Sequence, residues 1–282
     1  MTNPVLYETH MHTPLCKHAK GDPEEYAAHA EKRGLKGIIV TCHNPGPDPH
    51  FSARVRMAPD QFDDYVAMVE RARAACHGRI DVRLGLECDF LPEFIPFLTE
   101  LLDRAEFHHV LGSLHPQLPY YRERHDDGNG RAYFTTYYDL LAQAAESGLF
   151  DTLSHPDLVK NSYSKEWQLD DDLLDIIRRS LDRIAATGAA MELNTSGLHK
   201  RVREMNPAPE ILSEMQARGI PVVIGADAHE PKRVAADYEE ALALLKAAGY
   251  SHTSIFLDRQ RQDIDIDTAV ASLQPVKRFT FF

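Results

Sequence analysis

Short apolar runs alternate with longer amphipathic segments along almost the whole chain of 282 residues. The apolar runs are rich in Val, Ile and Leu, which is typical of buried parallel strands. They predict seven strands, over residues 5–10, 36–43, 80–87, 107–113, 150–154, 189–194 and 220–225. The segments between and after them predict seven helices, over residues 23–33, 59–77, 92–104, 131–147, 170–187, 207–218 and 237–248.

Local signals set the boundaries of these elements. Asp22 followed by Pro23 is a favourable helix start, with an N-cap side chain and proline at the first helical position. Polar, proline-containing stretches predict loops over residues 44–59 and 116–130. After a short apolar run at residues 253–257, we expect a polar tail.

Seven successive strand-helix units predict either an α/β barrel or a doubly wound sheet. Polar motifs follow strands one, two, three, four, five and seven of the predicted set. A barrel brings those strand ends together on one rim, where barrel active sites lie, whereas an open sheet spreads them along its edge. We therefore expect a barrel, and one domain over residues 1–282, because no linker, repeat or low-complexity segment interrupts the pattern.

The first of these polar motifs is His10-x-His12, at the end of the first predicted strand. Strand side chains alternate between two faces, so both imidazoles face the same side and form a candidate pair of metal ligands. A lone pair of this kind is more often solvated or hydrogen-bonded in a core. Here His, Glu or Asp recurs at one strand end after another. The candidate ligands are His10, His12, His18, His43, Glu87, His115, His155, Asp227 and His229.

These nine donors exceed the roughly four to six ligands that a single ion takes. They fit two or three divalent ions bridged by a carboxylate, and imidazole-rich sites suit zinc, iron or manganese. For a phosphate ester, such a cluster would lower the pKa of a bound water and clamp the phosphoryl oxygens. The alternative is that each histidine is a hydrogen-bonded loop residue, which explains single positions but not their coincidence at one rim.

The composition disfavours several other classes of protein. Lys and Arg total 31 against 43 Asp and Glu, so the formal net charge is −12 and a general nucleic-acid binder is not expected. The sequence shows no secretion signal and no apolar run of the roughly 20 residues that span a membrane, and we expect a cytoplasmic protein. The cysteines lack CxxC spacing and are expected to be buried free thiols: Cys16, Cys42, Cys76 and Cys88.

Seven motifs follow one another in a fixed order. They are His10-x-His12, Leu15-Cys16-x-His18, Thr41-Cys42-His43-Asn44, Gly85-Leu86-Glu87, Gly112-Ser113-Leu114-His115, Ser154-His155-Pro156-Asp157 and Asp227-Ala228-His229. In this order they resemble the polymerase and histidinol phosphatase (PHP) family. Within it, the histidinol-phosphate phosphatases are similar through further stretches, Arg54-Val-Arg56, Glu192-Leu-Asn-Thr-Ser-Gly-Leu198 and Asn206-Pro-Ala-Pro-Glu-Ile-Leu212.

The resemblance implies a distorted (β/α)7 barrel with a trinuclear metal site. Carried over residue by residue, the three ligand groups are His10, His12, Glu87 and Asp227; Glu87, His115 and His155; and His18, His43 and His229. Glu87 would bridge two ions, and we expect Glu87, Asp227 and His229 to take part in catalysis. A metal-bridging hydroxide would attack the phosphorus of a small phosphomonoester, which is L-histidinol phosphate in the similar enzymes of histidine biosynthesis.

Cationic loop residues bind the phosphate in this branch of the family. The candidates in this chain are Arg54, Arg56 and Lys160, and each is alternatively a solvated surface charge. His199 and Lys200 follow the sixth predicted strand, where substrate contact and a solvated loop both stay open.

Three features depart from the family pattern. Cys42 stands where the family has Asp, which removes a carboxylate and would lower metal affinity or change the preferred metal. Ser154 replaces the usual Gly, and we expect little effect. The segment after His115 differs in length and sequence, so the reaction is better supported than the identity of the substrate.

Three other functions stay open, as does the oligomeric state. The first is the same chemistry on another small phosphomonoester, a nucleotide or an oligonucleotide end. The second is a PHP domain that only binds metal or a partner, which nine intact ligand positions disfavour. The third is an amidohydrolase on a similar barrel, which is disfavoured because Glu87, and not a carbamylated lysine, ends the third predicted strand.

Overall fold

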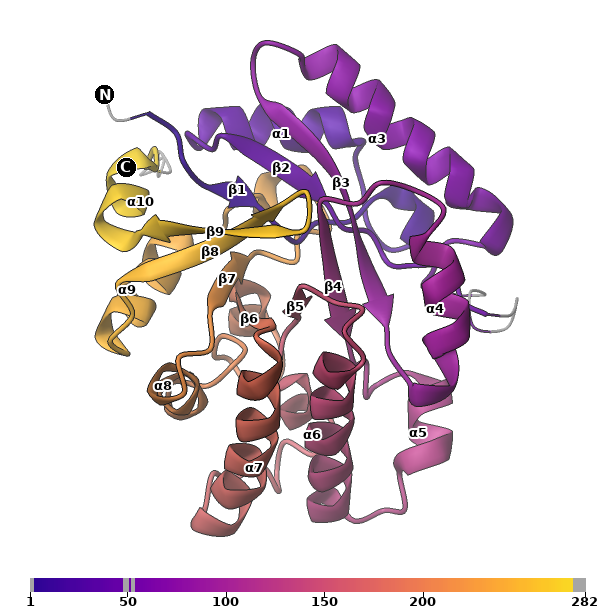
Figure 1. Cartoon of the computed structure of the whole chain (residues 1–282), viewed down its shortest axis with the longest axis vertical. Helices are drawn as coiled ribbons and strands as arrows, with labels where there is room; N and C mark the ends of the chain where they lie inside the picture. The colour runs from indigo at the N-terminus through magenta and orange to yellow at the C-terminus, as the bar shows by residue number, and fades with distance from the viewer. Residues whose placement is uncertain (1–2, 48–50, 52–53, 276–282) are drawn as a thin grey trace, which may run out of the picture.

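A curved sheet of nine strands forms the centre of the computed structural model, which describes residues 3–47, 51 and 54–275 (Figure 1). The strands lie side by side in chain order, and all neighbours are parallel except the last pair, which is antiparallel. They are β1 (Tyr7–Glu8), β2 (Gly37–Val40), β3 (Asp81–Asp89), β4 (His109–Ser113), β5 (Thr152–Leu153), β6 (Ala190–Asn194), β7 (Val222–Gly225), β8 (His252–Leu257) and β9 (Gln260–Asp265).

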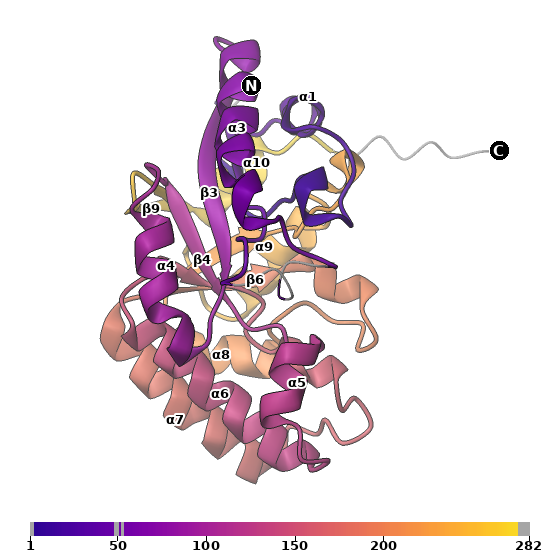
Figure 2. The same cartoon turned by 90° about the vertical axis from the view of Figure 1, so that its right-hand side faces the viewer.

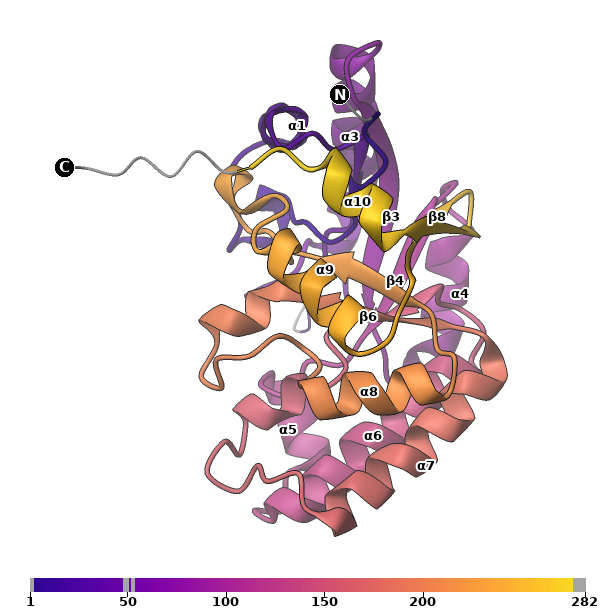
Figure 3. The same ribbon diagram turned by 90° about the vertical axis from the view of Figure 1, so that its left-hand side faces the viewer.

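Helices connect successive parallel strands and cover the outer face of the sheet. They are α1 (Pro23–Lys32), α3 (Phe62–Cys76), α4 (Ile95–Leu102), α5 (Pro119–His125), α6 (Gly130–Glu146), α7 (Asp171–Thr187), α8 (Pro209–Ala217), α9 (Tyr238–Ala247) and α10 (Ile266–Ser272). Helix α7 packs between α6 and α8, and the three form a layer along one side of the molecule (Figures 2 and 3). Among the described residues, no helix is both long and apolar enough to cross a membrane.

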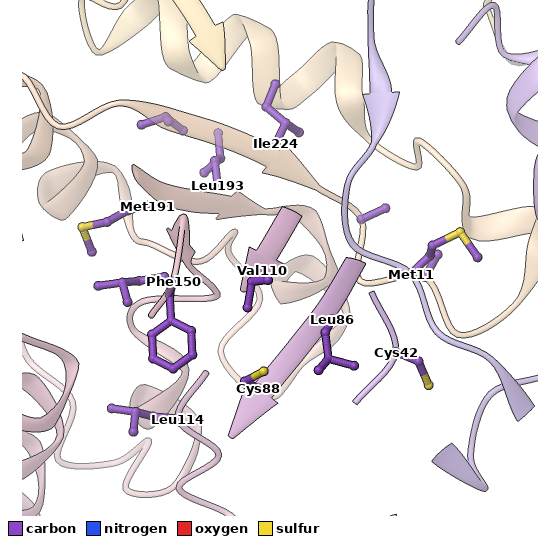
Figure 4. Packing of buried hydrophobic residues seen from close by; sticks show 14 of the residues in the cluster. Met11, Cys42, Leu86, Cys88, Val110, Leu114, Phe150, Met191, Leu193 and Ile224 are labelled. Carbon is purple, nitrogen blue, oxygen red and sulfur yellow. The ribbon is translucent and has the colours of Figure 1, made fainter. Parts of the chain in front are cut away.

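The two faces of the strands have different chemistry, because successive side chains point to opposite sides. Leu86, Val110 and Leu193 belong to the main hydrophobic core, part of which Figure 4 shows. Their neighbours in the chain, such as Glu87 on β3 and Glu192 on β6, are fully buried on the other face. The alternation therefore places carboxylates and imidazoles inside the curved sheet and leaves the apolar residues to anchor the helices.

The sheet closes only at one end. Strands β7 and β8 pair at a single position, Val223 with Ser254. Beyond β7 the chain turns back to the first strand, where Ala228 forms an isolated parallel bridge with Met11. The Ala228 amide donates to the His10 carbonyl oxygen at 3.0 Å. This bridge brings the motif after β7 against the motif after β1, so the barrel is closed at the rim that carries the polar motifs.

The α/β barrel prediction is confirmed, with two corrections. The sheet has nine strands rather than seven, because the short apolar run at residues 253–257 belongs to β8 and the expected polar tail after residue 257 contains β9 and α10. The predicted loop over 116–130 contains helix α5, which starts with Pro119 and buries only Tyr121. Residues 48–50, 52–53 and 276–282 of the predicted loop and tail lie outside the described residues. One domain over residues 1–282 stays a prediction.

Candidate metal centre

The nine predicted ligands come together at the rim that the bridge between Met11 and Ala228 closes. Their donor atoms form groups whose members lie within 4.8 Å of one another. The groups include His10, His12 and Asp227; Glu87, His115 and His155; and His18, His43 and His229. The structure thus brings together two of the expected sets in full and the first set without Glu87, which instead groups with His12 and His43. Cys16 joins His12 and His229 in a further group that the sequence did not indicate.

Glu87 lies at the centre of this cluster, at the carboxyl end of β3. Its Oε2 atom lies 2.6 Å from His43 Nδ1 and 3.4 Å from His10 Nε2. Its Oε1 atom lies 3.0 Å from His155 Nε2 and 3.6 Å from His115 Nε2. Each carboxylate oxygen therefore faces a different set of imidazoles, as a carboxylate that bridges two ions must.

Asp227 follows β7 and completes the first group. Its backbone has φ +49°, an uncommon left-handed conformation for a residue other than glycine. Its Oδ1 atom lies 3.0 Å from His12 Nε2 and 3.4 Å from His229 Nδ1. Burial opposes its ionisation, but Lys200 and the imidazole of His10 hold the pKa of the Asp227 carboxyl well below its usual range. Asp227 therefore presents a charged carboxylate to the cluster.

The third group is the most exposed. His18 Nε2 and His229 Nε2 approach to 2.9 Å, and their Nδ1 atoms bond the carbonyl oxygens of Cys16 and Asp227. Burial lowers the pKa of His229 to about 3, so this imidazole is neutral near pH 7. With Nδ1 donating to a carbonyl, the Nε2 lone pair of each ring is directed to the shared space between them.

Carboxylates outside the cluster orient several of the imidazoles. Glu192 Oε1 lies 2.7 Å from His10 Nδ1, and Glu192 Oε2 accepts from the His155 amide at 2.8 Å. Asp89 Oδ1 lies 2.6 Å from His115 Nδ1. When Nδ1 carries the proton in these pairs, the Nε2 lone pairs of His10 and His115 face the Glu87 carboxylate, so that a cation between them would be bound by both. The roles of Glu192 and Asp89 were missed in the sequence, although Asp89 follows Glu87 with the strand period of two.

Several buried atoms of the cluster lie close to one another but make no hydrogen bond of acceptable geometry among the described residues. They include His10 Nε2, His43 Nδ1, Glu87 Oε2 and His155 Nδ1. Such atoms are rare in folded proteins because each one costs free energy, and a divalent cation bound where they converge would satisfy them. A set of imidazole nitrogens and carboxylate oxygens fits divalent zinc, manganese or iron. The residues present therefore fit a metal cluster.

The negative charges of the cluster also favour a bound cation. Burial works against protonation of His10, yet Glu192, Glu87 and Asp227 raise its pKa well above the usual range. Burial likewise opposes protonation of His12, but its hydrogen bond to Asp227 raises the pKa to about 9. In the absence of metal these sites hold protons, and the same negative field attracts divalent cations.

A cavity of about 440 Å³ opens onto the cluster, and we call it the metal cavity. It is lined by ligands from all three groups, among them His43, His155 and His229, and by Arg56 and Lys200. Lys200 is half-buried, and its Nζ atom lies 3.3 Å from Asp227 Oδ2. Of the two sequence alternatives for Lys200, the structure therefore favours a position within reach of substrate.

The three predicted phosphate-binding cations occupy different environments. Arg54 is exposed. Arg56 is 2% exposed and pairs with Asp89 through Nε at 2.5 Å and Nη2 at 2.9 Å, while Nη2 also lies 3.1 Å from His115 Nδ1. Its side chain is therefore held at the wall of the metal cavity, and the alternative of a solvated surface charge is wrong for Arg56.

Lys160 is fully buried, so the surface-charge alternative is wrong here too. Its Nζ atom lies 2.9 Å from Asp157 Oδ2 and 3.1 Å from Glu204 Oε1, and it donates to the Met205 carbonyl at 2.9 Å. Lys160 does not line the metal cavity. The structure therefore does not bring it to the other candidate substrate residues, and its visible contacts join the segment after β5 to the loop after β6.

The positions that depart from the family pattern lie behind the cluster. Ser154 Oγ lies 3.4 Å from Glu87 Oε1, and Ser113 Oγ donates to the same oxygen at 2.5 Å. Ser154 thus contacts the central carboxylate, whereas the sequence led us to expect little effect of a serine at this position. Cys42 is buried as predicted, and its sulfur accepts from the Thr13 amide and hydroxyl at 3.4 and 3.2 Å. All four cysteines are buried free thiols.

Comparison with known proteins agrees with this α/β barrel and its cluster of metal-binding side chains. Residues 8–196 match the family model of the PHP domain. A Deinococcus radiodurans protein named "Probable histidinol-phosphatase" is 37% identical over 266 residues, covering 91% of this chain and 98% of the relative. The histidinol-phosphatase of Bacillus subtilis is 26% identical, over 83% of this chain and 97% of that protein. The chain belongs to the PHP domain family.

A solved structure shows the same fold. Histidinol phosphate phosphatase from Lactococcus lactis, in complex with zinc, L-histidinol and phosphate, superposes with a TM-score of 0.69 at 18% sequence identity. The match covers 91% of this chain and 98% of the Lactococcus chain. Both proteins therefore have the same barrel over nearly their full length.

Proposed function

We propose that this protein is a metal-dependent phosphomonoesterase that hydrolyses L-histidinol phosphate to L-histidinol and phosphate, a cytoplasmic step of histidine biosynthesis. The observation that carries the proposal is the position of Glu87, whose two oxygens face separate sets of imidazoles. Two relatives that align over most of this chain are named as histidinol-phosphatases, one of them at 37% identity. Together they support both the chemistry and the substrate.

The ligand groups would hold two or three divalent ions of zinc, manganese or iron. Bound there, the ions would activate water for attack and neutralise charge on the phosphoryl oxygens. The protein's own contribution is to keep the ligands in the required state. Glu192 and Asp89 would hold the proton on Nδ1 of His10 and His115, and charged neighbours keep Asp227 ionised despite its burial.

The metal cavity supplies the remaining contacts for a phosphate group. Arg56 and Lys200 bring two cations to its wall, where they would bind phosphoryl oxygens and stabilise the charge of the transition state. Arg54 and Lys160 stay predictions, although the burial of Lys160 between two carboxylates favours a supporting role. Asp227 and His229 line the same cavity and would orient water near the ions.

A second cavity of about 460 Å³ suits the leaving group of this substrate. It adjoins the cluster through His18, Asp227 and His229. Its wall is of mixed charge, because Glu230 lies in it beside Lys20 and Arg233, and Glu230 also pairs with Lys232 at 3.0 Å. The cavity would therefore give the leaving group space next to the metal cavity, and its charge alone does not select a cationic one.

The proposal is tested by measuring phosphate release from L-histidinol phosphate and from sugar, nucleotide and amino-alcohol phosphates, with zinc, manganese or iron supplied. We expect the highest kcat/KM for L-histidinol phosphate. Turnover of other monoesters without turnover of L-histidinol phosphate would contradict the proposed substrate but support the proposed phosphomonoesterase reaction. The absence of turnover with every metal and ester would favour a PHP domain that only binds.

A further inference from the structure

A third cavity, which we call the basic cavity, extends from the metal cavity. Its volume is about 450 Å³, and it shares Gln117, Leu158 and Lys200 with the metal cavity. Its remaining lining comes from Arg122, Asn161, Ser162 and Arg201. The two cavities are therefore neighbours around one set of side chains, and a phosphate held at the metals would have its ester group within reach of the basic cavity.

The walls of the basic cavity are joined to one another by hydrogen bonds. The Val202 amide donates to Asn161 Oδ1 at 2.9 Å, which ties the loop after β6 to the segment after β5. Tyr163, in that same segment, donates to Asp126 at the end of α5. The three segments that line the cavity thus hold each other in place, as a preformed binding site requires.

The chemistry of the basic cavity is cationic. Arg122, Lys200 and Arg201 line it, and its described lining residues include no Asp or Glu. Behind this wall Arg122 pairs with Asp126 and Lys200 with Asp227, which leaves Arg201 as the cation without such a pair among the described residues. Arg122 uses Nε and Nη2 for Asp126, at 3.0 and 2.7 Å, which leaves Nη1 for a ligand. Arg201 is exposed and has no ion-pair partner among the described residues.

The position of these cations decides which ester would use the cavity. A cationic leaving group such as L-histidinol would be repelled by them, whereas a carboxylate or a second phosphate would be attracted. Gln117 and Arg122 come from the segment after His115, so this segment supplies one wall of the basic cavity and one of its three cations.

We infer that the basic cavity receives leaving groups that carry a second anionic group, so that the enzyme also hydrolyses anionic phosphomonoesters in preference to neutral ones of the same length. The inference rests on the proposed phosphomonoesterase function and extends its range of substrates. Arg201 and Nη1 of Arg122 would contact the distal anion, while Lys200 lies between it and the reacting phosphate.

Two matched pairs of esters test this inference with the metal-loaded enzyme. The pairs are 3-phosphoglycerate with glycerol 3-phosphate, and 6-phosphogluconate with sorbitol 6-phosphate, which differ only in a carboxylate against a hydroxymethyl group. We expect kcat/KM to be at least about fivefold higher for the carboxylate member of one pair or both, as one charge-assisted contact provides. Equal values in both pairs would overturn the inference.

Variants of Arg201 link the preference to the cavity. Arg201→Gln should bring the ratio of kcat/KM between carboxylate and alcohol esters toward one, mainly through KM, and Arg201→Lys should restore part of it. Arg203→Gln is the matched control, because Arg203 is exposed on the same loop but does not line the cavity. A preference that survives Arg201→Gln would contradict the inference.

L-histidinol phosphate in the same assay separates this inference from the proposed function. Turnover of L-histidinol phosphate without any carboxylate preference would support the proposed function and contradict the role of the basic cavity in binding a second anionic group. A carboxylate preference without turnover of L-histidinol phosphate would support the role of the basic cavity and contradict L-histidinol phosphate as the substrate.

Discussion

The carboxylate of Glu192, on β6, and the imidazole of His10, just after β1, lie 2.7 Å apart through Oε1 and Nδ1, and both side chains are fully buried. The pair crosses the inside of the curved sheet and directs His10 Nε2 to Glu87, 3.4 Å away. Glu192 also accepts from the His155 amide at 2.8 Å. One carboxylate outside the cluster therefore positions two of its predicted ligands.

Glu192→Gln should lower metal affinity without unfolding the protein. The amide oxygen can still accept from His10, but the negative charge that makes the imidazole a better ligand is lost, and such changes cost about 10–100-fold in affinity. Competition with a chelator measures the effect. Glu239→Gln is the control, since Glu239 pairs with Arg33 at 2.7 Å, outside the cluster. Equal metal affinity of the two variants would contradict the role of Glu192.

Glu87→Gln should abolish metal binding and phosphate release together. A neutral amide cannot bridge two cations, and Glu87 faces imidazoles through both of its oxygens. Metal content after dialysis and initial rates of phosphate release measure the two losses, with the exposed Glu100→Gln on α4 as control. Full turnover by Glu87→Gln would disprove the bridged cluster.

Asp89→Asn should affect both stability and metal binding. Asp89 holds Arg56 through two contacts and His115 through a third, so its loss leaves a buried guanidinium without a countercharge. Breaking such a buried pair costs about 3–5 kcal/mol. Thermal unfolding and chelator competition are the measurements. Asp151→Asn, which breaks a pair with Arg259 at 2.6 Å, should lower stability and spare metal affinity.

Lys160→Met should destabilise the fold through loss of a buried charge. Asp157 and Glu204 would lose the ammonium that lies 2.9 and 3.1 Å from them, and the free energy of unfolding should fall by about 3–5 kcal/mol. Urea denaturation measures this loss. An unchanged unfolding free energy combined with a raised KM would instead give Lys160 the substrate-binding role expected from the sequence.

Metal uptake should release protons and strengthen as the pH rises. His12 has a pKa of about 9 without metal, against 6.5 for an unperturbed histidine. Its protonation stabilises the metal-free protein below pH 6.5, and this contribution is lost as the pH rises through 9. Metal ions bind the unprotonated ring, so their affinity should increase across the same window. Calorimetry in buffers of different ionisation enthalpy measures the protons, and metal binding that is independent of pH would contradict the assignment.

The ligand positions were predictable because they depend on a simple relation between sequence and fold. Parallel strands end on one rim, so a residue near the end of a buried strand, such as Glu87, or just after one, such as Asp227, lies near the others. The protonation state of the imidazole rings was harder to predict from the sequence, since it depends on partners on other strands. Glu192 lies 182 residues from His10 in the chain.

The parts that sequence patterns missed lack a periodic apolar signal. Strand β9 is almost entirely exposed and is held by backbone pairing with β8, so it reads as a polar tail. Helix α5 buries a single side chain of seven, Tyr121, which gives no apolar stripe. The burial of Lys160 was hidden for another reason, because Glu204 and the Met205 carbonyl reach it from a separate loop.

The most direct test of the central claim is the initial rate of phosphate release from L-histidinol phosphate, measured before chelation, after chelation and after metal is added back. We expect the rate to be lost with the metal and to return as two to three equivalents of zinc, manganese or iron are bound. A rate that survives complete removal of metal would contradict the assignment of the Glu87 cluster as the catalytic centre.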